Sequence, residues 1–204
     1  MPPEPTVLAF DTSAAHCAAA LLVGDRIVDF RVEPMAKGQA ERLFGLLEDL
    51  LSDNGKTYGD LDAIGVGTGP GNFTGIRIAV SAARGLAMGL GIPAVGVDGF
   101  EARCLDAPKP LSCFISAPRA QVYRQDFIGP EPVAPQMQDE QVARAEALGL
   151  GNAIAEGTDS ETLVRNIARI AATRFQSDDF RPAPLYVKPP DAAPSKHVAP
   201  KILT

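Results

Sequence analysis

The chain has 204 residues, of which 46% are hydrophobic and 22% charged, with a formal net charge of −6 and a pI near 4.9. A chain of this length can bury roughly 70–75% of its unfolded surface, so one large domain or two small lobes can form without disulfides or metals. The acidic balance argues against a protein that binds nucleic acid by itself, because such proteins usually present a basic face to the phosphates.

The first half of the chain predicts strands interspersed with helices. Two short apolar runs and one alternating run, the last two separated by Gly24-Asp25, indicate three strands joined by short turns. Leucines at helical spacing predict a helix that Asp53-Asn54-Gly55 ends. A second helix follows a glycine-rich loop, with Thr74 as its candidate N-cap. The expected strands lie at 6–11, 17–23, 26–32, 63–68 and 94–97, and the expected helices at 39–51, 75–90 and 99–105.

A proline-rich break at 106–110 (DAPKP) predicts a boundary between two lobes. Beyond it we expect a strand pair that turns near Pro118-Arg119, then two helices, the second capped by Ser160. An extended Pro-rich tail begins at Asp178 and is expected to be pinned at 185–187. The strands are expected at 111–117 and 121–128, and the helices at 140–148 and 160–175. The predicted organisation is an N-terminal lobe over 1–105 and a smaller C-terminal lobe over 106–204.

This order of elements predicts a mixed α/β fold. Three meandering strands followed by a helical crossover are also typical of the first lobe of the actin-like ATPase and sugar-kinase architecture. We therefore expect this two-lobe architecture, with a shortened second lobe.

The glycine-rich loop, GTGPGNFTGIR from Gly67 to Arg77, has two interpretations. A turn between a strand and a helix N-terminus can bind an anion, because backbone N–H groups point outward there. However, the loop lacks the lysine of a P-loop and the spacing of GxGxxG. The alternative is a connection that needs glycine for positive φ and for close approach of the backbone.

A second polar cluster, Asp11-Thr12-Ser13, ends the first predicted strand. In actin-like kinases this hairpin carries an acid and hydroxyls that face phosphate and magnesium, whereas the alternative role is capping of the strand end. A candidate nucleotide or anion site therefore comprises Asp11, Thr12, Ser13, Gly69, Gly71, Asn72 and Thr74.

Together these segments carry a specific resemblance. FDTSAAHCAAALLVGDRIV and AIGVGTGPGNFTGIRIAVSAARGLAMGLGIPAVGVDGFEA resemble the TsaB (YeaZ) family over about Val7 to Ala102, and the tail PLYVKPPDA does so more weakly. Asn72 stands where the family usually has serine, and Ile76 where it has leucine. Gln39-Ala40-Glu41 stands where His-Ser-Glu is common, so only the acid is kept.

The resemblance implies a non-catalytic scaffold. TsaB is the bacterial partner of the enzyme TsaD in making N6-threonylcarbamoyladenosine on tRNA. It joins TsaD through first-lobe helices, tends to form a homodimer through the same surface when alone, and meets the ATPase TsaE and the tRNA only through the complex.

Two predicted helices are candidates for such a partner surface. The helix over 75–90 is apolar nearly all round and rich in small residues, so it is either a core helix under the sheet or part of a helix bundle with another chain. The candidate partner-binding residues are Leu43, Leu47, Leu50, Ile76, Val80, Ala83 and Ala87.

Catalytic equipment is sparse in the sequence. The enzyme TsaD holds a metal through histidines at HxxxH spacing, but this chain has only His16 and His197, so no metal site and no cofactor are expected. We expect His16 to be a solvated turn residue rather than a member of a Ser-His-Asp triad. Two alternatives remain open: a small ATPase or kinase that uses Asp11 as a metal-facing acid, and a peptidase, an old label for this family.

The remaining features favour a cytoplasmic protein. Cys17, Cys104 and Cys113 show no CxxC spacing and are expected to be buried, reduced thiols. The first residues have no basic segment ahead of an apolar run, which argues against a signal peptide. The longest apolar stretch, 17–23, is far shorter than the ~20 residues that a bilayer span needs.

Overall fold

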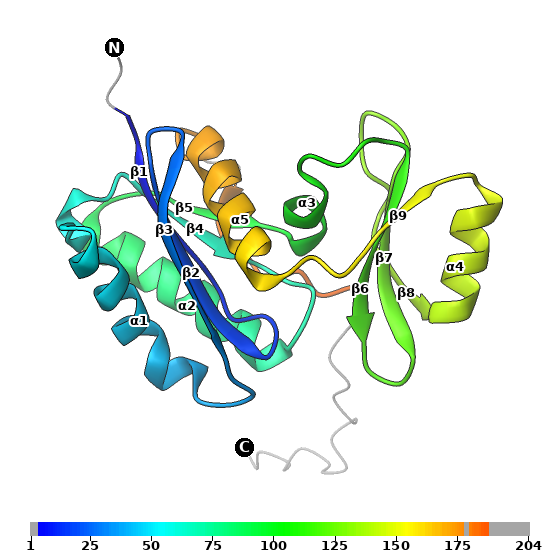
Figure 1. Cartoon of the computed structure of the whole chain (residues 1–204), viewed down its shortest axis with the longest axis horizontal. Helices are drawn as coiled ribbons and strands as arrows, with labels where there is room; N and C mark the ends of the chain where they lie inside the picture. The colour runs from blue at the N-terminus through cyan, green and yellow to red at the C-terminus, as the bar shows by residue number, and fades with distance from the viewer. Residues whose placement is uncertain (1–3, 178–179, 188–204) are drawn as a thin grey trace, which may run out of the picture.

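The computed structural model describes residues 4–177 and 180–187, which form two lobes side by side (Figure 1). The first lobe contains a five-stranded sheet in the order β3-β2-β1-β4-β5, and the second a four-stranded sheet in the order β8-β7-β6-β9. The first sheet comprises β1 (Thr6–Asp11), β2 (His16–Val23), β3 (Arg26–Pro34), β4 (Ala63–Gly67) and β5 (Ala94–Val97). The second comprises β6 (Leu111–Ala117), β7 (Gln121–Phe127), β8 (Gln136–Asp139) and β9 (Ala153–Ala155). The helices are α1 (Gln39–Asp53), α2 (Phe73–Leu90), α3 (Gly99–Cys104), α4 (Glu140–Gly149) and α5 (Ser160–Arg174), with a short 3-10 turn η1 (Tyr58–Asp60).

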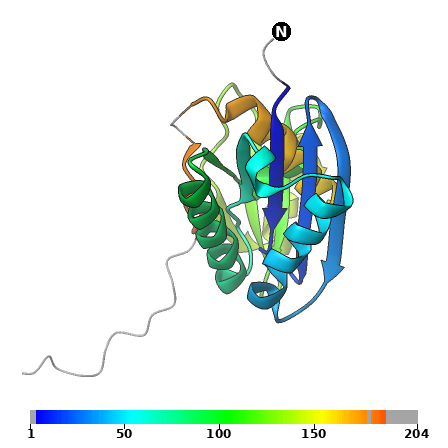
Figure 2. The same ribbon diagram turned by 90° about the vertical axis from the view of Figure 1, so that its left-hand side faces the viewer.

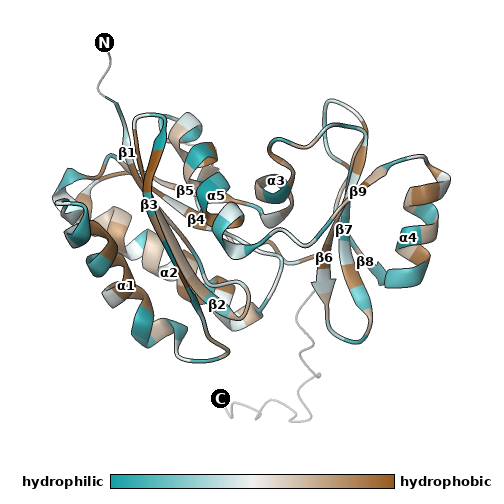
Figure 3. Ribbon diagram, viewed as in Figure 1, coloured by the Kyte–Doolittle hydropathy of each residue, from teal (hydrophilic) through white to brown (hydrophobic). Residues whose placement is uncertain are grey.

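The first sheet is buried on both faces. Successive side chains of β1 alternate between them: Val7 and Ala9 pack toward α5, whereas Leu8 and Phe10 pack toward α1 and α2. A strand covered on both faces needs a continuous apolar run, which is the pattern of TVLAFD. Figure 2 shows α1 and α2 next to each other in front of the sheet and α5 behind it. Hydrophobic residues accordingly run along these strands in Figure 3.

The sheet order and the helical layers confirm the expected two-lobe actin-like architecture. β2 pairs antiparallel with β1 on one side and with β3 on the other, while β4 and β5 are reached through helical crossovers and run parallel to β1. On the second sheet, α4 buries Ala143 and Ala147 against one face, and Phe100 and Cys104 of α3 pack against the other.

Helix α5 corrects the predicted division of the chain. The apolar face of α5 lies against β1, β2 and β4 of the first sheet, so this helix belongs to the first lobe and not to a lobe spanning 106–204. The segment after α5 also contacts the first lobe, because the Leu185 N–H donates to the carbonyl of Thr68, the residue that follows β4, at 2.8 Å. The break at 106–110 does separate the two sheets, but the second lobe ends before Ser160. The predicted tail beyond Val187 lies outside the described residues.

Two helix caps and two strands also differ from expectation. The side chain of Asn72 caps α2 by accepting from the Gly75 N–H, and the side chain of Asp159 caps α5 by accepting from the Thr162 N–H, so neither Thr74 nor Ser160 is the cap. β8 (QMQD) and β9 (AIA) were not expected, because each is very short and β8 is polar. The other strands and helices lie within about two residues of their predicted positions.

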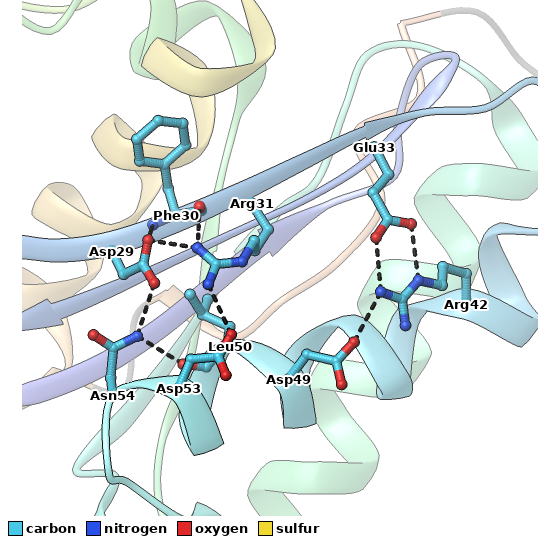
Figure 4. A network of polar contacts seen from close by, with 9 residues as sticks. All are labelled: Asp29, Phe30, Arg31, Glu33, Arg42, Asp49, Leu50, Asp53 and Asn54. Carbon is cyan, nitrogen blue, oxygen red and sulfur yellow. Dashed lines mark hydrogen bonds and ion pairs between the residues drawn. The ribbon is translucent and has the colours of Figure 1, made fainter.

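A polar network holds α1 against the edge strand β3 (Figure 4). Arg42 of α1 donates two hydrogen bonds to the Glu33 carboxylate, at 2.8 and 2.7 Å. Arg31 of β3 donates to Asp29 at 2.6 Å and to Asp53 of α1 at 3.0 Å. These side chains are 25–62% exposed to solvent, so each pair contributes little to stability, about 0–1 kcal/mol. Their charges do protect the open edge of β3 from pairing with another strand.

Candidate functional site

The glycine-rich loop packs directly against the β1–β2 hairpin. The Asn72 N–H donates to the Ser13 carbonyl at 2.6 Å, and the Thr12 hydroxyl donates to the Gly75 carbonyl at 2.7 Å. A Cβ at Gly71 would collide with the Ser13 carbonyl, and one at Gly75 with the Thr12 carbonyl. Glycine is therefore required at both positions, and it serves close contact between two backbone segments.

Backbone N–H groups that could bind an anion already donate hydrogen bonds within the protein. The Asn72 N–H is bonded to the hairpin and the Gly75 N–H to the Asn72 side chain. Ser13, Gly71 and Asn72 line a cavity between the two lobes, whereas Asp11 and Thr12 are buried behind it. Gly69 lies against Ile76, and Thr74 lines a separate hollow at the start of α1. The structure brings the two predicted clusters together, and an anion contact at them stays a prediction.

Asp11 is the centre of a buried polar chain. Its Oδ1 accepts from the Ser13 N–H at 3.0 Å, the Ser13 hydroxyl at 2.9 Å and His16 Nε2 at 2.7 Å. The other ring nitrogen of His16, Nδ1, lies 2.8 Å from the Ser160 hydroxyl at the start of α5. Because a carboxylate only accepts, Nε2 carries the proton and Nδ1 accepts from Ser160 in the neutral ring.

The expectation that His16 is a solvated turn residue is wrong. His16 is the first residue of β2, is only 6% exposed, and connects the hairpin to α5. Ser160, His16 and Asp11 thus form a hydrogen-bonded series, but Ser160 is not among the residues that line the interlobe cavity. The arrangement ties the returning α5 to the end of β1.

The carboxyl group of Asp11 is held in its ionised form. Burial by itself raises its pKa, but the hydrogen bond and charge of His16, together with the two bonds from Ser13, outweigh burial and lower it below its ordinary value of 3.8. An acid poised to bind a metal ion would face a cavity, whereas Asp11 is 1% exposed and already bonded.

Most of the predicted partner-binding side chains face inward. Leu43, Leu47 and Leu50 are fully buried between α1 and the sheet, and Ala83 lies in the same core. Ile76 and Val80 are also buried, and Ala87 is half-buried. The leucine stripe of α1 therefore covers the chain's own sheet, and these side chains are not available to a partner in this structure.

The same two helices present a different surface outward, which we call the α1–α2 face. Phe44 is 44% exposed and Met88 85% exposed, and between the helices lies a hollow of about 420 Å³. The hollow is lined by Phe44, Tyr58, Ser81, Ala82, Gly85, Leu86, Gly89 and Leu90. In the sequence, Phe44 falls beside the leucine stripe of α1, which is a local signal for this face, whereas nothing in the sequence points to Tyr58.

The Tyr58 hydroxyl is a further distinctive feature of the α1–α2 face. It is buried and has no hydrogen-bond partner, and burial, with a contribution from Glu48, raises the pKa of Tyr58 to about 12. A buried hydroxyl without a partner is uncommon, since the great majority of such groups are bonded.

The described residues contain neither a cluster of metal ligands nor a membrane-spanning helix. No group of three or more His, Cys, Asp or Glu side chains in that part of the chain could hold a metal ion. No helix within 4–177 or 180–187 is long and apolar enough to cross a bilayer. His197 lies outside these ranges.

Comparison with known proteins gives a family match over most of the chain. Residues 33–183 match the family model described as TsaD: tRNA N6-adenosine threonylcarbamoyltransferase. The tRNA threonylcarbamoyladenosine biosynthesis protein TsaB of Escherichia coli is 36% identical over 91 residues, which are 45% of this chain and 39% of that protein. TsaB of Bacillus subtilis is 34% identical over 121 residues, 58% of this chain and 53% of that protein. The chain thus spans about two fifths to a half of the length of these curated relatives.

A solved structure matches the whole fold. YeaZ from Pseudomonas aeruginosa superimposes with a TM-score of 0.68 at 24% identity, covering 89% of this chain and 99% of that one. At this level of identity the likeness concerns the fold alone.

Proposed function

The chain belongs to the family that the TsaD model describes. From this premise we propose that it is a TsaB-like accessory scaffold subunit in tRNA N6-threonylcarbamoyladenosine synthesis. In this role it binds a TsaD-like catalytic subunit, which transfers the threonylcarbamoyl group to adenosine 37 of tRNAs that read ANN codons. A TsaE-like ATPase docks on the complex, tRNA is contacted through the complex, and the isolated chain forms a homodimer. The proposed location is the cytoplasm.

The observation that carries the partner role is the α1–α2 face. It combines an exposed aromatic side chain, an exposed methionine and a small-residue hollow, which is the composition of an interface core. Gly85 and Gly89 have open space where a Cβ would stand, so another helix can approach α2 closely there. A standard interface would bury about 800 Å² on each partner.

The buried position of Asp11 supports a non-catalytic role. An ATPase or kinase of this architecture needs an acid that reaches the nucleotide's metal ion and loop donors that reach its phosphates. Here Asp11 is bonded to His16 and Ser13 behind the cavity, and loop donors bond the hairpin and the Asn72 side chain. These contacts favour a structural junction over the alternative of a small Asp11-dependent ATPase.

The pathway is tested by depletion. The protein is depleted in its source cell, and threonylcarbamoyladenosine in digested bulk tRNA is quantified by mass spectrometry. We expect the modified nucleoside to fall and to return when the wild-type chain is supplied. An unchanged level under confirmed depletion would remove the chain from this pathway.

The partner role is tested with two glycine variants. Gly85→Arg places a long side chain in the hollow of the α1–α2 face, whereas Gly149→Arg makes the same change in the open end of α4. With a purified TsaD-like subunit from the same source, we expect Gly85→Arg to abolish complex formation in sedimentation velocity and Gly149→Arg to preserve it. Equal binding by both variants would contradict the assignment of this face.

A further inference from the structure

The cavity between the two lobes is a separate feature from the α1–α2 face. It measures about 1100 Å³, slightly above the roughly 300–1,000 Å³ that is typical of small-molecule sites. Its first-lobe wall is the β1–β2 hairpin with the glycine-rich loop, and its second-lobe wall is formed by β6 and β7. The lining includes Phe73, which is exposed, Ile115 and Tyr123 on the α3 side of the second sheet, and Phe114 and Val122 on its α4 side.

The charged groups in the lining are unequally paired. Arg144 bonds Glu140 at 2.8 Å and Glu156 at 2.5 Å, so this cation and both acids in the lining are occupied. Arg103 of α3 is different. Among the described residues its one hydrogen bond is from Nη1 to the Gly99 carbonyl of its own helix at 2.8 Å, and it has no carboxylate partner there. A guanidinium has five N–H donors, so most of those on Arg103, a residue of the cavity lining, have no acceptor among the described residues.

We propose that the interlobe cavity binds a small organic anion, a carboxylate or phosphate on an apolar body, and that Arg103 pairs with its anionic group. The planar fork of a guanidinium matches both groups with two parallel bonds. Phe73 of the first lobe and Ile115 and Tyr123 of the second offer apolar surface for the body of such a ligand. Tyr123 also lines the cavity and places a phenol near the same wall.

The site differs from one for a nucleotide polyphosphate. Polyphosphate sites combine several backbone donors with a metal-bearing acid, but Asp11 is not in the cavity lining and the Asn72 N–H is bonded to the hairpin. One unpaired cation matches one anionic group. The proposal does not depend on the TsaD-like partner, because binding is measured on the isolated full chain.

Naphthyl probes test the proposal directly. The chain has no tryptophan, so naphthalene fluorescence can be followed with little protein background. The probes are 2-naphthoate, 2-naphthyl phosphate and the neutral 2-naphthalenemethanol, titrated by fluorescence anisotropy. We expect at least one anionic probe to bind about tenfold tighter than the neutral one, since bonds to charged groups are worth that factor or more. The tighter of the two anions identifies the group that the cavity prefers.

Two variants assign the effect to Arg103. Arg103→Gln should remove the preference for the anionic probe, while Arg119→Gln, which makes the same change at an exposed turn outside the lining, should retain it. Equal affinities of wild type for all three probes, or an unchanged preference in a folded Arg103→Gln variant, would overturn the proposal. Displacement of the probe by magnesium-ATP at a lower concentration than by 2-naphthoate would overturn it too, in favour of a nucleotide site. The wild-type comparison decides the anion preference even if Arg103→Gln does not fold.

Discussion

Two alanine substitutions in α1 should have different effects: Leu47→Ala should lower the stability of the chain, and Phe44→Ala should weaken partner binding. Leu47 is fully buried in the core between α1 and the sheet, and Phe44 lies on the exposed side at 44% exposure. Leu47→Ala removes close-packed atoms and leaves a cavity, which costs about 2–5 kcal/mol. Full burial of a phenylalanine is worth about 1.5–3 kcal/mol, and a little over half of Phe44 is covered, so Phe44→Ala should cost about 1 kcal/mol in the isolated chain.

The assay has two readouts. Urea unfolding followed by far-UV circular dichroism gives the stability of each variant, and isothermal titration with the TsaD-like subunit gives its affinity. We expect Leu47→Ala to shift the urea midpoint strongly while the fraction that remains folded still binds. Phe44→Ala should keep the midpoint near wild type and lose at least about tenfold in affinity, as exposed aromatic anchors of interfaces do. The reasoning is refuted if Phe44→Ala unfolds as readily as Leu47→Ala, or if a stable Leu47→Ala protein loses affinity as Phe44→Ala is expected to.

Three further predictions concern the hairpin junction and the thiols. Asp11→Asn removes a charged acceptor that receives three hydrogen bonds, so we expect a loss of about 1.5–3 kcal/mol in urea unfolding. Because folding lowers the pKa of Asp11, its carboxylate stabilises the fold above pH 3.8, and this stabilisation is lost as the pH falls further. The difference in unfolding free energy between wild type and Asp11→Asn should therefore shrink below pH 3.8 in an acid titration. Gly75→Ala should cost at least about 1–3 kcal/mol, because its Cβ meets the Thr12 carbonyl, whereas Gly89→Ala in open space on the same helix should gain about 0.5–1 kcal/mol; equal effects would contradict the close-contact argument. Burial raises the pKa of Cys17 to about 11, so at pH 8 its thiol should react with Ellman's reagent only after unfolding, and rapid native labelling would count against the buried environment.

The sequence predicted the first lobe well, because its signals are local. Gly24-Asp25 separates β2 and β3, and the leucine period of α1 and the Gly91-Ile92-Pro93 stop of α2 each act within a few residues. The Asp11 cluster and the glycine-rich loop were placed in one candidate site, and the structure shows that they are in contact at the ends of the neighbouring strands β1 and β4.

The remaining features depend on distant parts of the chain. Apolar residues at a period of 3.6 show that α1 has an apolar face, but they do not show what covers that face. Leu43, Leu47 and Leu50 were therefore predicted to bind a partner, whereas in the structure they pack against the chain's own sheet. Similarly, the amphipathic pattern of α5 does not say which sheet receives it. His16 looked like a turn residue because the group that completes its hydrogen bonding, Ser160, is 144 positions away.

The return of α5 to the first lobe has a consequence for synthesis. All five strands of the first sheet have left the ribosome's active centre once Val97 is made, but the helix that covers one face ends at Arg174, 77 residues later. At a translation rate of about 5–20 residues per second, that face waits roughly 4–15 s for its cover. During that interval Val7, Ala9 and Ala18 lie on an open apolar sheet, a surface that chaperones bind and that aggregates. A transcript cut between these two points would therefore yield a nascent product with every strand of the sheet and no means of closing it.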